Sequence, residues 1–405
     1  MPRTFPTHAL AAIALGVAAA CAVAPAAAAG QRPAVPRAAT HADEFQGVSC
    51  TTAKGCLAVG SRFDSKTDEL LALGETRNPG SSTWAVHDPA PISGARTTGF
   101  GPIGNGETVS CVSSPSAMCM GIGSYNNSAE HQLNYAATWD WSSWKVVNPP
   151  NPSPTLSSGL DAVRCVSSKF CLTIGHWIDS ATSKDALESQ VWNGKSWAMT
   201  KKMPLVPANA TSGVRLWGLS CVSTTWCMAV GDYNTSSSDQ PLLSEVWNGK
   251  TWTIHLPPNP SGGNAHALVG VSCLSTKFCN AVGDSLNSKL AFVSLGETWN
   301  GKSWTIQPTP EGKKKGLSEL FDVSCLTTKF CLSVGSLAAE WNGKSWSSKA
   351  FPVPSSKDIT NAVSLSCLSV KDCTAAGGYS STAGTFTMAW TWNGKSLALQ
   401  PAQNP

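Results

Sequence analysis

The sequence predicts an all-β fold, a seven-bladed β-propeller of four-stranded antiparallel blades with one disulfide inside each blade. Two alternating segments carry this prediction. The first reads V-S-C-x5-C-x-A-V-G in outline and occurs seven times. The second reads W-N-G-K-[ST]-W in most repeats and follows the first. A period of about 40–50 residues with Trp and Gly signals is typical of propeller blades, which normally have four strands.

The first segment supplies strands one and two of each blade. Fifteen cysteines are present, and fourteen of them form the seven pairs of this segment. An even number is expected in a mature protein that enters an oxidising compartment. The two members of a pair would face each other across a hairpin, close enough for a disulfide. The predicted bridges are Cys50–Cys56, Cys111–Cys119, Cys165–Cys171, Cys221–Cys227, Cys273–Cys279, Cys325–Cys331 and Cys367–Cys373.

A metal site at these cysteines is not expected. Each pair offers only two ligands, and no His or second Cys pair recurs beside it. No cofactor motif was found elsewhere in the chain, so the predicted cofactor and metal content is none.

The second segment supplies strands three and four. Asn-Gly between strand-like residues favours a hairpin, because both residues tolerate positive φ in a type I′ turn. In the fifth repeat the predicted register has Trp299 facing Lys302 and Glu297 facing Trp304. We expect the paired Trp side chains to pack together and against the next blade.

The N-terminus is expected to lie outside the propeller. Arg3 precedes an apolar run that ends in small residues near Ala29, as in a secretory signal peptide. The expected organisation is a signal peptide over 1–29, a disordered linker over 30–44 and the propeller over 45–405. No transmembrane segment is expected after the signal. Cys21 lies inside the signal, and its lipidation is the alternative to its removal.

The repeat resembles secreted propellers with Asp-box (BNR) repeats, and those of the photosystem-assembly-factor type, whose blades carry D-G-G-x-T-W followed by V-x-F and W-A-V-G. It is also similar to cysteine-stapled secreted proteins of actinobacteria. The resemblance covers residues 45 to 400 and implies the propeller architecture. Asn replaces the Asp of the box, the turn is one residue shorter, and cysteines replace hydrophobic and Trp positions. Such a resemblance implies no particular activity.

The candidate ligand site lies in the loops that differ between repeats. Those loops and the connectors between blades share one face of a propeller, and binding commonly resides in variable loops on a rigid scaffold. Aromatic residues recur two positions after the glycine of A-V-G, beside amides, carboxylates and an imidazole, which suits a sugar. The candidate residues are Tyr125, Asn126, His176, Trp177, Asp232, Tyr233 and Tyr379. Alternatively, these aromatics cap strand two and pack on the neighbouring blade.

Two further candidates lie near the axis. Arg164 replaces the Ser that precedes the first cysteine in the other repeats, and Trp217 enters from a connector. Arg164 is expected either to bind an anion or to pair with Asp161.

Catalysis is the less favoured hypothesis. Sialidases need an arginine cluster and a Tyr-Glu arrangement, which the sequence lacks. Other glycosidases need two carboxylates about 5–10 Å apart. Several aspartates could supply such a pair, and the sequence does not select among them: Asp161, Asp179, Asp232, Asp284 and Asp322.

The amino-acid composition limits the kinds of partner that the protein is expected to bind. Charged residues make up 13% of the chain and the net charge is +4, which argues against a nucleic-acid binder. The sequence therefore predicts a secreted or cell-surface monomeric binding or scaffold module that recognises a carbohydrate or a protein. A glycan-processing hydrolase or lyase with carboxylates at the propeller axis is the alternative.

Overall fold

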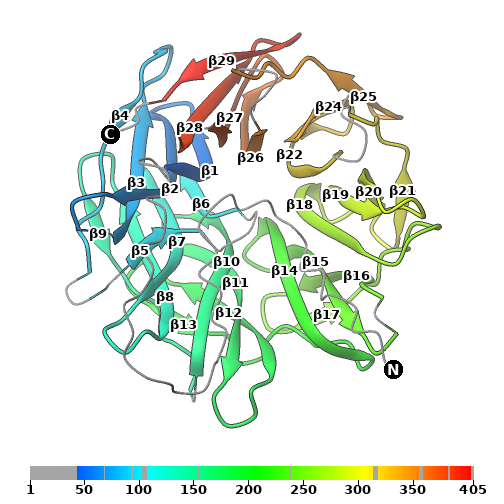
Figure 1. The fold of residues 1–405 in the computed structure, drawn as a ribbon, viewed down its shortest axis with the longest axis horizontal. Coiled ribbons are helices and arrows are strands. Elements are labelled where there is room, and N and C mark those ends of the chain that lie inside the picture. The colour runs from blue at the N-terminus through cyan, green and yellow to red at the C-terminus, as the bar shows by residue number, and fades with distance from the viewer. Residues whose placement is uncertain are drawn as a thin grey trace, which may run out of the picture.

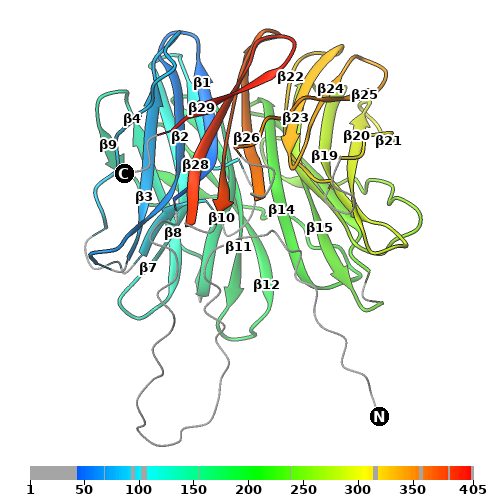
Figure 2. The same cartoon turned by 45° about the horizontal axis from the view of Figure 1, so that its top comes forward.

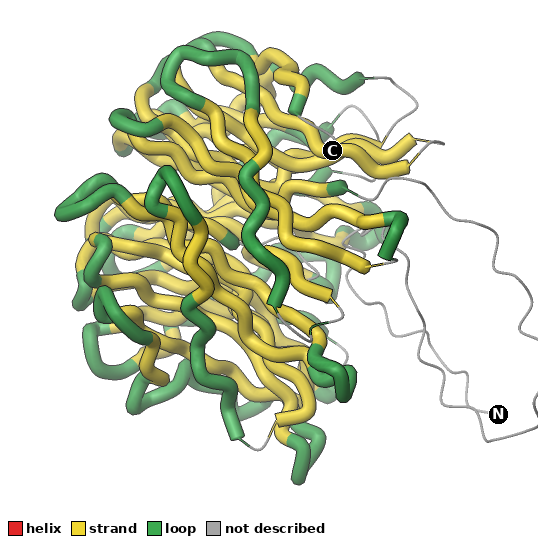
Figure 3. The backbone as a smooth tube through the Cα atoms, turned by 90° about the vertical axis from the view of Figure 1, so that its left-hand side faces the viewer, coloured by secondary structure: helices red, strands yellow, loops and turns green. Residues whose placement is uncertain are grey.

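The chain is a seven-bladed β-propeller, with the blades arranged around a central axis (Figure 1). The computed structural model describes residues 43–67, 69–92, 95, 97–101, 107–153, 155–237, 239–312, 318–354, 359–381 and 384–402. The expected signal peptide, and the expected linker up to residue 42, lie outside the described residues. Strands and loops make up the described parts, with no helix among them (Figure 3).

The first three blades follow one another along the chain. Blade one holds β1 (Glu44–Thr51), β2 (Gly55–Asp64), β3 (Glu69–Arg77) and β4 (Ala85–Val86). Blade two holds β5 (Thr97–Phe100), β6 (Val109–Val112), β7 (Met118–Asn126), β8 (Gln132–Trp139) and β9 (Trp144–Val146). Blade three holds β10 (Thr155–Ser167), β11 (Phe170–Asp179), β12 (Asp185–Trp192) and β13 (Trp197–Met199).

The remaining four blades repeat the pattern without interruption. Blade four holds β14 (Ala210–Ser223), β15 (Trp226–Thr235), β16 (Leu242–Trp247) and β17 (Trp252–Ile254). Blade five holds β18 (His266–Ser275), β19 (Phe278–Leu286), β20 (Phe292–Trp299) and β21 (Trp304–Gln307). Blade six holds β22 (Leu320–Thr327), β23 (Phe330–Gly335), β24 (Ala338–Trp341) and β25 (Trp346–Lys349). Blade seven holds β26 (Ile359–Ser369), β27 (Asp372–Ser381), β28 (Gly384–Trp392) and β29 (Leu397–Pro401).

Each blade is an antiparallel sheet of consecutive strands that lie side by side (Figure 2). The first strand of a blade lies nearest the axis and the last lies at the rim (Figure 1). Blade two departs from this, because β5 and β6 both pair with β7. A single parallel pairing, Ser157 with Gln132, links blades two and three into one nine-stranded sheet. Among the described residues blades one and seven exchange no strand, although Asp43 N donates to Thr385 O over 3.1 Å.

All seven predicted disulfides are present, one in each blade, with Cα–Cα distances between 3.9 and 4.0 Å. In blade five the ladder also places Cys279 opposite Trp299 and Trp299 opposite Trp304. A row of two cysteines and two tryptophans therefore crosses this blade close to its turns. In blade one Arg77 takes the place of the first tryptophan, and its guanidinium lies 5.6 Å from the ring centroid of Trp84.

The predicted register of the Asn-Gly hairpin was wrong. Trp299 pairs directly with Trp304, not with Lys302, so the turn has four residues instead of two. The reason is the Asn300 side chain, whose Oδ1 accepts from the backbone N of Lys302 (2.9 Å) and of Ser303 (3.0 Å). These bonds close an Asx-type turn in which Gly301 takes a φ of +95°.

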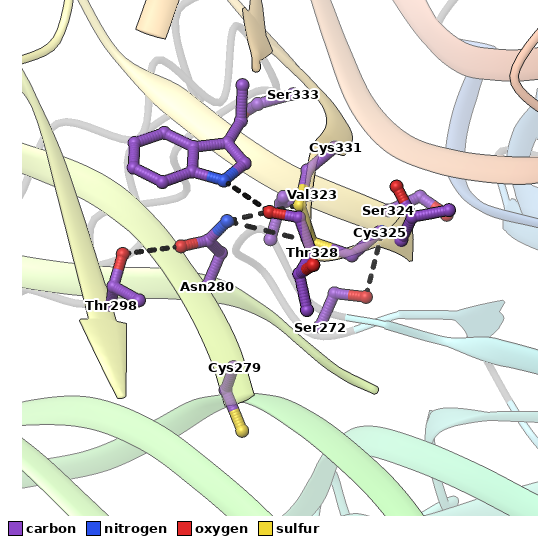
Figure 4. The surroundings of a disulfide bond; sticks show 12 residues. Ser272, Cys279, Asn280, Thr298, Val323, Ser324, Cys325, Thr328, Cys331 and Ser333 are labelled. Atoms are coloured by element: carbon purple, nitrogen blue, oxygen red, sulfur yellow. Dashed lines mark hydrogen bonds between the residues drawn. A yellow bond between two sulfur atoms is a disulfide. The ribbon is translucent and has the colours of Figure 1, made fainter. Parts of the chain in front are cut away.

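Serine hydroxyls join neighbouring blades. The Ser before the first cysteine accepts a hydrogen bond from the backbone N of the next blade's first cysteine, as for Ser272 and Cys325 at 3.0 Å (Figure 4). The other five pairs of this kind are Ser49–Cys111, Ser110–Cys165, Ser220–Cys273, Ser324–Cys367 and Ser366–Cys50. The exception is the boundary after blade three, where Arg164 replaces the serine.

The hydrophobic core lies between adjacent blades. One cluster joins Met228 and Val230 of blade four to Leu268, Leu295 and Trp299 of blade five. Equivalent clusters fill the other boundaries. The expectation that the paired Trp side chains pack together and against a neighbouring blade is therefore confirmed, with the two rings of blade five 5.7 Å apart.

Candidate functional site at the bulged inner strands

Two positions on the first two strands of a blade bring polar side chains together in blades three and four. The first is the bulge position, four residues before the first cysteine, where the ladder of the inner strand skips one residue. The second is the residue directly after the glycine of A-V-G, on the next strand. A β-bulge re-aims the side chain of its extra residue and is frequent near functional sites. The residues at these two positions therefore decide which hydrogen bonds and charges each blade presents.

Blade three fills both positions with a hydrogen-bonded carboxyl and imidazole. Asp161 occupies the bulge, and its Oδ2 lies 2.9 Å from Nδ1 of His176. The Asp161 side chain is fully buried, whereas the imidazole is 20% exposed. Trp177, the next residue, is half-buried.

Blade four fills the same positions with an indole and a carboxylate. Asp232 Oδ1 accepts from Trp217 Nε1 over 2.6 Å, and Oδ2 accepts from Gln240 Nε2 over 2.7 Å. Burial raises the pKa of Asp232 to about 6, although both hydrogen bonds and the Arg215 charge act in the opposite direction. Because its N–H is held by the carboxylate, the half-buried Trp217 ring has a fixed orientation.

Blade five leaves a carboxylate without a partner. Asp284 follows the glycine, but the bulge position holds Val269, which offers no hydrogen bond. The side chain is 3% exposed and has no hydrogen bond to any described residue. Burial, and then the nearby carboxylates Glu319 and Asp232, raise its pKa well above the ordinary value.

Glu319 belongs to the neighbouring blade six. It is 7% exposed, and burial raises its pKa to about 7. Its backbone N donates to Ser336 Oγ over 2.9 Å, while its carboxylate makes no hydrogen bond to a described side chain. Asp284 and Glu319 are thus two buried acids from adjacent blades, and the charge of Glu319 contributes to the raised pKa of Asp284.

The aromatic positions do not form a uniform exposed ring. Tyr233 is only 3% exposed and packs in the core cluster between blades three and four. Tyr379 stacks on Phe386 with ring centroids 5.2 Å apart, and Tyr125 packs against the cluster between blades one and two. Asn126 sits at the end of its strand, opposite Gln132. Trp177 and Trp217 are half-buried, as are Tyr125 and Tyr379, whereas Tyr233 is buried. The packing alternative therefore describes Tyr233 better than an exposed platform does.

Arg164 pairs with Glu107, so the expectation that it pairs with Asp161 was wrong. Arg164 Nη2 lies 3.2 Å from Glu107 Oε1. The two residues line a cavity of about 350 Å³ among the cysteine hairpins at the axis, together with Asp322. Burial raises the pKa of Glu107 to about 8, while the Arg164 charge lowers it and the Asp322 charge raises it. Asp161 instead lies against His176.

Sequence reasoning missed the pairing of the bulge position with the residue after the glycine. Both positions can be found by aligning the repeats of the chain with one another. That alignment could have predicted the combinations Asp161–His176, Trp217–Asp232 and Val269–Asp284. Glu319 has no such signal, because it acts across a blade boundary.

Further properties of the described residues concern metal sites, membrane spans and an oxidising environment. Among the described residues no group of three or more His, Cys, Asp or Glu side chains is arranged to hold a metal ion. Within the same residues no helix is long and apolar enough to cross a membrane. The seven disulfides indicate folding in an oxidising environment.

No protein family model matches the chain, and no curated protein matches its sequence. Among solved structures it is similar to YCF48 bound to D1 peptide, with 13% identity, a TM-score of 0.46, and coverage of 90% of this chain and 95% of that chain. A fucose-specific lectin from Aleuria aurantia has 12% identity, a TM-score of 0.41, and coverage of 72% and 94%. The Hadza microbial sialidase Hz136 has 9% identity, a TM-score of 0.48, and coverage of 87% and 65%. Likeness at such identities says nothing about activity.

Proposed function

We propose that this protein is a secreted binding module that recognises a carbohydrate at the bulged inner strands of blades three and four. The supporting observation is the 2.6 Å hydrogen bond from Trp217 to Asp232. It holds an indole face in one orientation next to a carboxylate. A sugar presents a C–H face for stacking and hydroxyls for hydrogen bonding, and a preorganised aromatic surface lowers the entropy lost on binding.

The neighbouring blade adds complementary groups. His176 is partly exposed and held by Asp161, while Trp177 is a second half-buried indole. The rigid blades, each with its disulfide, support recognition without large rearrangement. The seven disulfides and the signal-like N-terminus support a location outside the cell.

A glycan array with the wild-type protein tests this proposal. Trp217→Ala and Trp177→Ala should each lower binding to the recognised glycan by about tenfold or more, because each removes a stacking surface. Trp217→Phe keeps an aromatic ring but loses the hydrogen bond to Asp232, so its glycan affinity should lie between those of wild type and Trp217→Ala. Tyr379→Phe is the matched control and should bind normally. If no glycan binds, a protein partner becomes the better hypothesis.

A glycan-processing enzyme is the second candidate, and the pair Asp284–Glu319 favours it. Glycosidases use two carboxyl groups, one of which is kept protonated near neutral pH by its surroundings. Here both acids are buried with raised pKa values, and Asp284 has no hydrogen-bond partner among the described residues. Turnover of a bound glycan that is abolished by Asp284→Asn, with binding retained, would establish catalysis. Binding without turnover supports the module alone.

A further inference from the structure

The turns at one end of the propeller form a single surface. In an antiparallel four-stranded blade, the turn between strands one and two and the turn between strands three and four lie at the same end. Trp299 confirms this arrangement, because its Nε1 donates to the carbonyl of Thr276 in the cysteine hairpin of the same blade over 3.1 Å. Trp192, Trp341 and Trp392 make the same contact in their blades. We call this end the turn face.

Ten exposed lysines lie on the turn face. Five stand in the cysteine hairpins and five follow Asn-Gly in the outer turns. They are Lys54, Lys169, Lys277, Lys329 and Lys371 in the first group, and Lys195, Lys250, Lys302, Lys344 and Lys395 in the second. Blades three, five, six and seven carry two each, blades one and four carry one each, and blade two carries none.

Few negative charges balance these lysines. Asp140 and Asp372 are the acidic residues in or directly beside the turns of this face. None of the ten lysines forms an ion pair with a carboxylate among the described residues. The turn face is therefore strongly cationic, although the chain as a whole has a net charge of only +4.

The lysine positions are rigid. Backbone N of Lys302 is held by Asn300, and the Lys277 stem lies against Gly301. Disulfides hold the inner turns. The lysine ammonium groups extend into solvent from turns that are already ordered. Binding of a partner therefore costs little backbone entropy.

Apolar side chains stand among the lysines. Val166 and Val222, each directly after a first cysteine, are 36% and 37% exposed, and Val370 in a cysteine-hairpin turn is 42% exposed. Lysines with interspersed apolar side chains on one face are the composition that favours binding at a membrane interface.

We propose that the turn face docks on a lipid bilayer that contains anionic phospholipids. Lysines attract an anionic lipid surface as point charges, and their contributions add when they approach it together. The lysines are spread around a ring at one end of the molecule, so a planar surface can meet all of them at once. A linear polymer could contact only those along its path. Docking on this face leaves the variable loops at the opposite end directed away from the membrane.

Co-sedimentation with vesicles tests the proposal. The full mature chain should bind vesicles of phosphatidylcholine and phosphatidylglycerol but not vesicles of phosphatidylcholine alone. Binding should weaken as salt rises toward about 0.15 M and above, because salt screens exposed charges. The variant with the five outer-turn lysines, at 195, 250, 302, 344 and 395, changed to Gln should bind at least about tenfold more weakly.

A matched variant separates position from net charge. It changes five exposed lysines outside the turn face to Gln, namely Lys66, Lys184, Lys201, Lys202 and Lys289, and should bind within about twofold of wild type. Changing the five outer-turn lysines to Arg should preserve binding, and circular dichroism should show every variant folded. Equal losses in both Gln variants, or absence of vesicle binding, would overturn the proposal. So would binding to soluble polyphosphate in place of vesicles.

Discussion

Ser366 in the last blade accepts a hydrogen bond over 3.0 Å from the backbone N–H of Cys50 in the first blade, 316 residues away in sequence. The same contact joins neighbouring blades elsewhere in the ring, but here the two blades are not consecutive in the chain. The bond therefore contributes to ring closure, together with the packing of β1 against β26 and β27.

Ser366→Ala should lower the free energy of unfolding by about 1 kcal/mol, the usual contribution of a buried hydrogen bond. Ser272→Ala removes the equivalent bond between consecutive blades and should have an effect of similar size at equilibrium. Guanidinium unfolding measures both, with the exposed Ser236→Ala as control. Unchanged midpoints for both the Ser366 and the Ser272 variant would show that these bonds add nothing to stability.

Removing one disulfide should destabilise the protein modestly. The bridge Cys273–Cys279 spans a sequence separation of 6, and the chain-entropy relation gives at most about 2.4 kcal/mol for such a short loop. The double variant Cys273→Ala, Cys279→Ala should thus stay folded with a lower guanidinium midpoint. Loss of the folded state on removal of this single bridge would mean that the hairpin does not form without it.

Stability should fall as pH rises, because several buried carboxyl groups favour their protonated form. Burial raises the pKa of Glu297 to about 8 and of Glu245 to about 8. Between about pH 4.5 and 8 the folded state holds more protons than the unfolded state, so this stability is fully present below pH 4.5 and is lost as pH rises through 8. Thermal unfolding should therefore occur at higher temperature at pH 5 than at pH 8.

Glu297→Gln should reduce that pH dependence. Glu297 is fully buried, and its two oxygens have no partner among the described residues. An amide of the same shape removes the charge that burial disfavours. The melting temperature of the variant should exceed that of wild type at pH 8 and differ less at pH 5. An unaltered pH profile would contradict the assignment of Glu297 as one of its sources.

Asp284→Asn and Asp232→Asn should have opposite effects on stability near pH 7.5. Asp284 lacks a hydrogen-bond partner among the described residues, and burial and two nearby acids raise its pKa, so replacing a carboxyl group whose ionised form is disfavoured should be stabilising. Asp232 accepts two side-chain hydrogen bonds, and an amide there would place its N–H₂ against a donor, which should be destabilising. Melting temperatures of the two variants measure these effects, and destabilisation by Asp284→Asn would contradict the absence of a hydrogen-bond partner for Asp284.

The sequence alone determined the features that depend on neighbours within one repeat. Each cysteine pair and each Asn-Gly turn is closed by residues a few positions apart, so spacing was enough to predict the disulfides, the hairpins and the number of blades. Even here the side chain of Asn300 shifted the expected register, because its hydrogen bonds favour a four-residue turn.

Only the tertiary structure decided which polar residues meet. Tyr233 is buried because blade three packs over it, and Arg164 pairs with Glu107 because adjacent blades bring the two together. Asp284 stands without a partner because the bulge opposite it holds Val269, and it comes near Glu319 only when blade six lies beside blade five. Contacts across blade boundaries depend on the ring geometry, and residue spacing along the chain does not encode them.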